Sequence, residues 1–390
     1  MTVKQKNTEL EGKEVRAFTA PPLYFFKLIY LVYMKKGNKK MELLNETLTK
    51  IKPLDVKAMA EAVERQNQLT KPAGSLGRLE ELSIQLCGIQ GRCLPVLKNK
   101  AIITMAGDHA VAREGFHNWP QAVTVQMIMN IATGGAGVNA LANHSGIKVI
   151  PVDMGVMSDL PTNCGIINKK VGYGVKSIIR EAAMTREEAI SAIEAGIQLV
   201  LDEKKQNGLD VVGTGDMGIG NTTPSSAMCS VMTGVTVEEA TGRGTGINDI
   251  QLQAKIKAIK EAITLHKPDK KDAIDVLYKL GGYEIAGIAG VCLGAAVTNT
   301  MVVVDGFIST AGAMVAGMLS PQAKAYMVSA HKSVEPGHTA MLQFLGLKPV
   351  LDLDFRLGEG TGAALTINLV EAAVAVISNM RTFAEAGVDS

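Results

Sequence analysis

A carboxylate set between glycines is the strongest candidate for chemistry in this chain. Glu359 stands between Gly358 and Gly360 in the run RLGEGTGAA, which follows an apolar segment and precedes a long apolar helix. The flanking glycines give the carboxylate little local shielding, so a ligand can approach it closely. Gly360 and Gly362 also place backbone N–H groups near the helix start, where anions bind. We expect Glu359 to be functional rather than a helix cap.

The densest glycine run, GTGDMGIGNTTP at residues 213–224, follows another apolar segment. It contains the G-x-G-x-x-G pattern of dinucleotide sites, but Gly supplies 40 of the 390 residues, and Pro224 interrupts the first turns after the pattern. We favour a phosphate or ribose cradle, in which backbone N–H groups and nearby hydroxyl and amide side chains approach an anion. A plain glycine-rich turn is the alternative. The candidate ligand residues here are Gly215, Gly218, Gly220, Asn221 and Thr222.

A second glycine loop, TGRGTGIND at residues 241–249, brings Arg243 and Gly244 forward as candidate phosphate contacts. Lys255 follows on the next expected helix, where an ordinary surface lysine fits the spacing equally well. The segment SAHKSVEPGH, which begins at Ser329, places two His, a Lys and a Glu after an apolar run. No third convergent ligand accompanies the two His residues, so we expect no metal site; a substrate loop and surface polar groups both remain open.

The run MVVVDGFISTAG at residues 301–312 superficially resembles the loop by which common phosphoribosyltransferases hold phosphoribosyl pyrophosphate. Gly306 stands where the second acidic residue is expected, and Ala311 separates Thr310 from Gly312. These departures remove much of the case for that loop. Earlier, the run AGDHAVAREGFHNWP offers an Asp–His pair as a dyad or as a hydrogen-bonded strand end, and two aromatic residues as pocket walls or core.

The bulk composition excludes several classes of function. The net charge is +2, from 40 Lys and Arg against 38 Asp and Glu, which gives no field for nucleic acid or a membrane surface. Five cysteines are scattered, with no C-x-x-C pair. The chain is therefore expected in a reducing cytoplasm.

Apolar runs that end in Gly- or Asp-rich turns recur along the chain after residue 100 and alternate with helical patterns. The expected strands are residues 101–108, 148–155, 208–216, a strand ending at 305, 325–330 and 349–354. The expected helices between and after them include residues 185–206, 251–266, 270–280 and 363–386. This alternation predicts an α/β fold with a Rossmann-like, mostly parallel sheet and helices on both faces. Ligands bind outside the carboxyl ends of such strands, where the glycines and carboxylates gather.

The N-terminal part of the chain is expected to form an extension and a small helical domain. Residues 1–40 form an extension that we expect to be poorly ordered. Its apolar run at 23–34 is too short to span a bilayer, and the strongest basic cluster, KKGNKK, follows that run, unlike in a signal peptide. A peripheral anchor is the alternative. Residues 41–98 predict a small helical domain, indicated by two amphipathic segments and by Ser75 as a helix cap, and completed by the C-terminal helix at about 363–388. Residues 99–362 form the large α/β domain, and no transmembrane segment is expected.

Eight segments in order resemble the nicotinate-nucleotide:dimethylbenzimidazole phosphoribosyltransferase family. They are KPAGSLGRLE, AGDHAVAREG, GTGDMGIGNTTPSSA, TGRGTGI, GGYEIAGIAG, VDGFISTAGA, SAHKSVEPGH and RLGEGTGAAL, and the likeness runs from about residue 41 to 388. The resemblance implies a homodimer whose partner helps to complete each site. It places the catalytic glutamate on Glu359 and a donor-side acid on Asp216, where the family pattern has Glu. It also places a basic donor contact on Lys255 and the base pocket around Asn118, Gln126 and Met217.

The reaction that the resemblance implies moves the phosphoribosyl group of nicotinate mononucleotide to 5,6-dimethylbenzimidazole with inversion. The products are α-ribazole 5′-phosphate and nicotinate, in the lower-ligand branch of cobalamin biosynthesis. Nicotinate leaves through a neutral ring nitrogen, so neither a metal nor a cofactor is expected. Asp216 would stabilise the oxocarbenium character at C1′, and Glu359 would take the proton from the attacking imidazole.

Other interpretations remain open at this point. The same chemistry can serve another lower-ligand base: adenine, another benzimidazole, or a phenol, the last as part of a two-subunit enzyme with a similar chain. A magnesium-dependent enzyme that uses phosphoribosyl pyrophosphate is a second interpretation. A non-catalytic subunit or binding module is a third.

Overall fold

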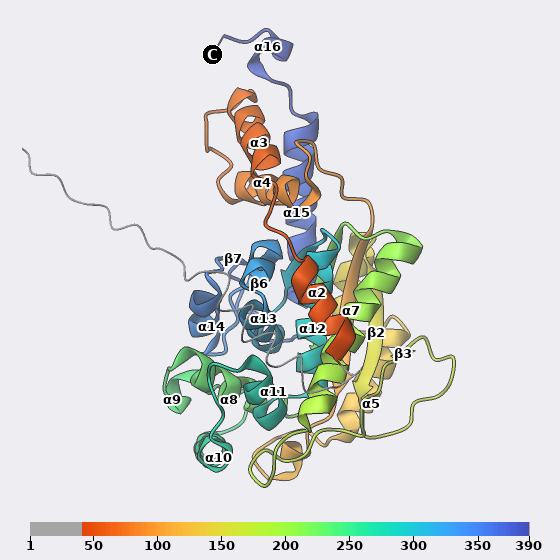
Figure 1. The fold of residues 1–390 in the computed structure, drawn as a ribbon, viewed down its shortest axis with the longest axis vertical. Coiled ribbons are helices and arrows are strands. Elements are labelled where there is room, and N and C mark those ends of the chain that lie inside the picture. The colour runs from red at the N-terminus through yellow and green to blue at the C-terminus, as the bar shows by residue number, and fades with distance from the viewer. Residues whose placement is uncertain (1–40, 390) are drawn as a thin grey trace, which may run out of the picture. The chain divides into compact units, whose positions relative to one another are not determined.

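A seven-stranded parallel sheet organises residues 41–389, the part of the chain that the computed structural model describes (Figure 1). The strands are β1 (Lys100–Gly107), β2 (Lys148–Gly155), β3 (Ile167–Asn168), β4 (Val211–Met217), β5 (Met301–Val304), β6 (Met327–His331) and β7 (Pro349–Leu351). Their order is β3-β2-β1-β4-β5-β6-β7. The strand order reverses between β1 and β4, which is where ligands bind in a doubly wound sheet. The expected Rossmann-like fold is confirmed.

Helices cover both faces of the sheet. On one face lie α5 (Ala122–Ala132), α6 (Gly137–His144) and α15 (Thr361–Asn379); on the other lie α12 (Tyr283–Val297) and α13 (Phe307–Leu319), with α7 (Arg186–Asn207) packed on α12. The remaining helices are α2 (Glu42–Lys50), α3 (Val56–Gln68), α4 (Arg78–Gln90), α8 (Thr222–Thr233), α9 (Val237–Ala240), α10 (Asp249–His266), α11 (Ala273–Leu280), α14 (His338–Leu345) and α16 (Phe383–Ala386), with 3-10 turns η2 (Ala110–Arg113) and η3 (Pro321–Tyr326).

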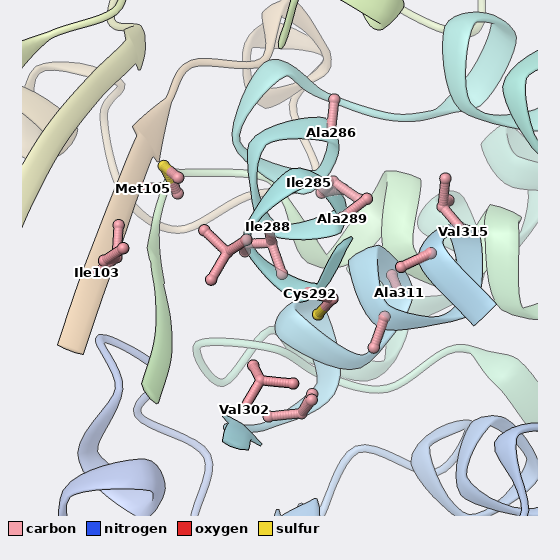
Figure 2. Close-up of a cluster of buried hydrophobic side chains, with 14 of the residues drawn as sticks. Ile103, Met105, Ile285, Ala286, Ile288, Ala289, Cys292, Val302, Ala311 and Val315 are labelled. Carbon is pink, nitrogen blue, oxygen red and sulfur yellow. The ribbon is translucent and has the colours of Figure 1, made fainter. Parts of the chain in front are cut away.

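The main hydrophobic core lies between the sheet and α12. Figure 2 shows Ile103 and Met105 of β1 facing Ile288 on α12, with α13 beside that helix. Side chains alternate along a strand, so the neighbouring Ile102 of β1 faces the other layer, where it would meet a Cβ at Gly360 at 2.6 Å. The strands thus carry apolar residues on both faces, as a buried parallel sheet requires.

Glycine permits the close crossing of α7 and α12. A Cβ at Gly290 would lie 2.0 Å from the carbonyl oxygen of Ile193, and one at Gly196 would lie 2.0 Å from the carbonyl oxygen of Gly287. No side chain larger than hydrogen fits at either position, because backbone atoms cannot move aside. These glycines therefore serve packing and not ligand binding.

A smaller core joins α3, α4 and the C-terminal half of α15, which lie side by side in Figure 1. Its buried members are Ala62, Cys87 and Ile377. In contrast, α2 packs on α7 and α12. The described residues belong to one compact unit, and the division into domains at 41–98 and 99–362 stays a prediction. The expectations for residues 1–40 lie outside the described residues.

Several local expectations were wrong. Ser75 does not cap α4, because the N-cap position is Gly77, with no side-chain cap. Instead the buried carboxylate of Glu80 receives the N–H of Leu76 at 3.0 Å and the ammonium of Lys71 at 2.7 Å. The helix expected at 363–386 ends at Asn379, and a Thr382–Glu385 capping box starts α16. The strand β3 was not predicted, because its two residues are exposed and do not form an apolar run.

One described helix, α15, is long and apolar enough to cross a membrane by length and composition alone. It packs against β4, β5, β6 and β7 through residues such as Ile367 and Val370, which are fully buried. A core helix passes the same test, so α15 is weak evidence of a membrane span.

Candidate functional site

The carboxylate of Asp216 lies at the end of β4, at the switch point of the sheet. Its Oδ2 atom accepts a hydrogen bond of 3.0 Å from Nδ2 of Asn221, while Oδ1 is buried without a hydrogen-bond partner. Burial raises the pKa of Asp216 to about 8, helped by the charge of Asp305 and opposed by the Asn221 bond. A positive charge placed beside such a buried carboxyl group stabilises its ionised form.

Glu359 is buried, which corrects the expectation of an open carboxylate: its side chain and backbone together are 3% exposed. Its Oε2 atom accepts the backbone N–H of Val138 at 3.0 Å, at the start of α6. Burial raises the pKa of Glu359, and hydrogen bonds from the N–H groups of Val138 and Gly137 act against that rise. The site therefore contains a desolvated carboxyl whose charged form has dedicated donors, which suits a general base.

The backbone at Glu359 is in the left-handed region, with φ of +62° between two glycines that are also left-handed. Hydrogen bonds on both sides hold it there. The N–H of Glu359 donates to the carbonyl oxygen of Asp216, its carbonyl oxygen accepts from Oγ1 of Thr104 at 2.8 Å, and the next N–H, that of Gly360, donates to Oδ2 of Asp305 at 3.2 Å. Such backbone strain persists only where the surroundings enforce it.

Asp305, which follows β5, explains why the helix after Glu359 starts where it does. Its two oxygens accept the N–H groups of Gly360 and Ala363 at the start of α15, at 3.2 and 3.0 Å. Burial raises its pKa to about 7, and these backbone bonds oppose the rise. In the sequence, this segment was compared with a phosphoribosyl pyrophosphate loop, from which it departs because Gly306 replaces the second acidic residue. The signal for Asp305 itself was one acid after an apolar strand.

Lys255 lies inside the protein and not on its surface: it is 1% exposed on α10. Its ammonium donates to Oγ1 of Thr222 at 2.9 Å and to the carbonyl oxygen of Gly242 at 3.1 Å. Burial lowers its pKa to about 8, and the nearby carboxylate of Glu335 acts in the opposite sense. A buried, under-satisfied ammonium beside a glycine loop is a natural partner for a phosphate.

Two adjoining hollows are lined in part by Asp216 and Lys255, and together we call them the donor pocket. They share Gly218, Ile219, Asn221, Thr222, Gly244 and Thr245; one also includes Asp216, Met217, Ser333, Glu335 and Gly358, and the other includes His117, Gly220, Arg243 and Lys255. Most of the predicted cradle residues are thus brought together. Pro224 does not interrupt α8, because it occupies the first turn, where its missing N–H is not needed.

An apolar hollow adjoins the donor pocket and shares Thr245, Arg356 and Leu357 with it. Its walls include Trp119, Leu141, Phe355 and Leu357, and it also takes in Gly137, Thr361 and Arg356. Trp119 is 52% exposed and Leu357 is 62% exposed. Large exposed apolar side chains around a concave surface are typical of a ligand or partner site.

Other predicted site residues fit the pocket less well. Arg243 lines the donor pocket, but its guanidinium pairs with Asp249 and donates to the carbonyl oxygen of Ile247. Asn118 is exposed and donates to the carbonyl oxygen of Gly246 at 3.1 Å. Gln126 is exposed on α5 and is not among the residues that line these hollows.

Ser329 is buried in the middle of β6, with no partner for its hydroxyl. Its role and those of the other candidates stay predictions. Among residues 41–389, no group of three or more His, Cys, Asp and Glu side chains is placed to hold a metal ion.

A buried pair beneath the site was not expected. Nε2 of His109 lies 2.6 Å from Oε1 of Glu284, and both side chains are buried. Asp108 instead accepts the N–H of Met157 at 2.8 Å, so it is not the hydrogen-bond partner of His109. The sequence gives no signal for this pair, because Glu284 lies within an otherwise apolar helix far along the chain. Phe116 belongs to the core.

A doubly wound sheet with a glycine-rich loop, a buried lysine and two carboxylates at its switch point is the arrangement expected of an α/β phosphoribosyltransferase. Residues 51–388 match a family model described as phosphoribosyltransferase. Nicotinate-nucleotide–dimethylbenzimidazole phosphoribosyltransferase from Dehalococcoides mccartyi (strain BAV1) is 54% identical over 348 residues, 89% of this chain and 99% of that protein. The protein of that name from Geobacter metallireducens is 52% identical over 349 residues, 90% of this chain and 99% of that protein.

The crystal structure of the enzyme of that name from Thermus thermophilus superposes with a TM-score of 0.81 at 38% identity. It covers 86% of this chain and 100% of that chain. The chain therefore belongs to the nicotinate-nucleotide–dimethylbenzimidazole phosphoribosyltransferase family.

Proposed function

We propose that this protein transfers the phosphoribosyl group of nicotinate mononucleotide to 5,6-dimethylbenzimidazole, giving α-ribazole 5′-phosphate and nicotinate in the lower-ligand branch of cobalamin biosynthesis. One observation carries the proposal. The donor pocket, which includes the buried Asp216 and Lys255, and the apolar hollow meet at the loop with Glu359, since Arg356 and Leu357 line both. A polar pocket suited to an anion and an apolar hollow suited to an aromatic acceptor thus adjoin at the loop that carries the buried Glu359.

The chemistry follows from these groups. Lys255 and the N–H groups of the glycine loop bind the donor phosphate. As the bond from C1′ to the pyridinium nitrogen breaks, the ring takes the bonding electrons and leaves neutral, while positive charge develops on the ribose. Positive charge on the bound donor favours the ionised form of Asp216, and this carboxylate stabilises the ribose. One imidazole nitrogen of the acceptor attacks C1′ from the opposite face, and Glu359 takes the proton from the other nitrogen.

The direct experiment incubates the purified protein with nicotinate mononucleotide and 5,6-dimethylbenzimidazole and follows both products by chromatography. We expect stoichiometric nicotinate and α-ribazole 5′-phosphate, with unchanged activity in EDTA. A protein that consumes no donor with any aromatic base would refute the proposal. Activity only with phosphoribosyl pyrophosphate and magnesium would replace it with the alternative donor.

A different lower-ligand base is the second candidate, favoured by one departure from the family pattern. Asp216 is one methylene shorter than the glutamate that the pattern has at this position, and Met217 beside it lines the donor pocket. A panel of adenine, benzimidazole, 5-methoxybenzimidazole, phenol and p-cresol, each with the same donor, ranks the acceptors by kcat/KM. A requirement for a second, similar chain would favour the phenol acceptor.

We also propose a homodimer in the cytoplasm. The large exposed side chains Trp119, Leu353 and Leu357 near the apolar hollow support an interface there. All five cysteines are free, which fits a reducing compartment. Light scattering on the purified protein and fractionation of cells test the two statements separately.

A further inference from the structure

The start of α6 receives the carboxylate of Glu359. The N–H of Val138 donates to Oε2 of Glu359 at 3.0 Å, and the N–H of Gly137 also bonds to this carboxylate. Gly137 and Val138 are the first two residues of α6, so the helix itself provides no acceptor for their N–H groups. The carboxylate thus supplies the acceptor that these two groups lack within the helix.

Further contacts fix this helix start in place. The side chain of Asn139 accepts the N–H of Ala136 at 3.0 Å and donates to the carbonyl oxygen of Ile131 at 3.0 Å. Gly137 is closely covered, since a Cβ there would lie 2.9 Å from Cδ2 of Leu357 and 3.3 Å from Oε2 of Glu359. The backbone of the first turn is therefore fixed relative to the Glu359 loop.

We propose that the backbone N–H groups of Gly137 and Val138 are positioning groups for the proton acceptor of this enzyme. They hold the Glu359 carboxylate in its charged form, with Oε2 on the N–H of Val138, so that the carboxylate can take the proton from the acceptor base. The inference rests on the proposed function, in which Glu359 is that proton acceptor. In this proposal the N–H groups act through Glu359.

The physical need for these donors comes from burial. Burial by itself raises the pKa of Glu359, and a protonated carboxyl cannot act as a base. The titratable groups on neighbouring elements do not help: Asp216 at the end of β4 and Asp305 after β5 are both acidic, and both are buried. Arg356, on the same loop as Glu359, has an exposed side chain at the rim of the hollows. The two N–H groups are thus the donors that favour the anion.

The substitution Val138→Pro removes one of these donors, since proline has no N–H. Proline is tolerated in the first turn of a helix, where no intrahelical bond is lost. The matched control is Val138→Ala, which disturbs packing but keeps the N–H. We expect the acidic limb of the kcat/KM–pH profile to move to higher pH by about one unit or more in V138P, because a hydrogen bond to a charged group is lost. In V138A the limb should stay in place.

If V138P does not fold, a second pair of variants, at Gly137, tests the positioning role of the N–H groups. Gly137→Pro and Gly137→Ala both add a Cβ, and only the first removes an N–H; the preceding Ala136 is extended, as a residue before proline should be. An equal limb position in the Pro and Ala variants of either pair would overturn the inference. Glu359→Gln is measured alongside, because turnover that survives in E359Q refutes the proposed base itself, which is a separate failure.

Discussion

The backbone N–H of Glu359 donates a hydrogen bond of 3.2 Å to the carbonyl oxygen of Asp216. The two segments also touch elsewhere: a Cβ at Gly215 would lie 2.1 Å from the carbonyl oxygen of Glu359, and one at Gly358 would lie 3.2 Å from Oδ1 of Asp216. The main chain therefore sets the spacing of the two acidic residues, and flexible side chains contribute little to it. An enzyme that must place one carboxylate by the ribose and one by the acceptor gains from such a fixed spacing.

Replacing Glu359 by Gln tests the proton acceptor. The amide keeps the size of the side chain and can still accept the N–H of Val138, but it cannot take a proton. We expect kcat to fall by about 10²- to 10⁴-fold, with little change in the Kd of nicotinate mononucleotide. Initial rates and calorimetric titration measure the two quantities. The matched control is Glu371→Gln, at an exposed position on α15, for which we expect the parent activity. Donor binding lost together with kcat would point to a structural role instead.

The raised pKa of Asp216 predicts how stability depends on pH. Its pKa is about 8 in the folded protein, chiefly because of burial, whereas an unfolded aspartate titrates near 4. Between these values the folded state keeps a proton that the unfolded state has lost, so the free energy of unfolding falls as pH rises. Asp216→Asn removes this contribution. We expect D216N to become more stable than the parent, by about 1 kcal/mol or more, as pH rises from 5 to 8.

Thermal unfolding at several pH values measures this difference. The control is Asp352→Asn, where the aspartate side chain is 63% exposed, and its curve should run parallel to that of the parent. A parallel curve for D216N as well would show that the Asp216 carboxyl keeps no extra proton in the folded state. The same variant should have lost turnover, because an amide cannot offset positive charge on the ribose.

The strands could be predicted because each buried strand is an apolar run that ends in a turn. The expected strand at residues 148–155 coincides with β2, and the expected start of the first strand differs from β1 by one residue. The short β3 could not be predicted, since Ile167 and Asn168 are exposed and carry no alternating pattern. Its pairing with β2 depends on tertiary placement of the chain.

The site was only partly visible in the sequence. The glycines beside Glu359 marked it as unusual, and the structure shows that they provide a left-handed backbone as well as space. The burial of Glu359 could not be predicted, because Gly137 and Val138, which cover it, lie far away in the sequence. They belong to a run of small residues without charged side chains. Local spacing carries no information about such contacts. For the same reason the burial of Lys255 was not predicted.

Replacing Lys255 by Met tests the donor-phosphate contact. The change keeps most of the side-chain length and removes the charge that Thr222 and Gly242 hold in place. We expect the Kd of nicotinate mononucleotide to rise by about tenfold to a hundredfold, as the loss of a charged hydrogen bond implies. Nicotinate riboside, which has no phosphate, should bind the variant and the parent with similar affinity. The control Lys257→Met changes a lysine on the same helix whose side chain is 78% exposed. An equal loss of affinity for both ligands would exclude a phosphate contact.

Replacing Thr104 by Val tests whether the strained backbone at Glu359 needs its restraints. Thr104 and Val have the same shape, so the packing of β1 is kept, while the hydrogen bond of 2.8 Å to the carbonyl oxygen of Glu359 is lost. A buried carbonyl without a donor should lower the free energy of unfolding by about 1–3 kcal/mol. We also expect kcat to fall by about tenfold, because the carboxylate is less well oriented once its backbone can relax. Denaturant unfolding and initial rates measure the two effects. In Thr264→Val, a matched change at an exposed position on α10, stability should change by less than about 0.5 kcal/mol, with kcat unaltered. A T104V protein with reduced stability but full kcat would mean that the other bonds, from the N–H of Glu359 to Asp216 and from the N–H of Gly360 to Asp305, orient Glu359 without help.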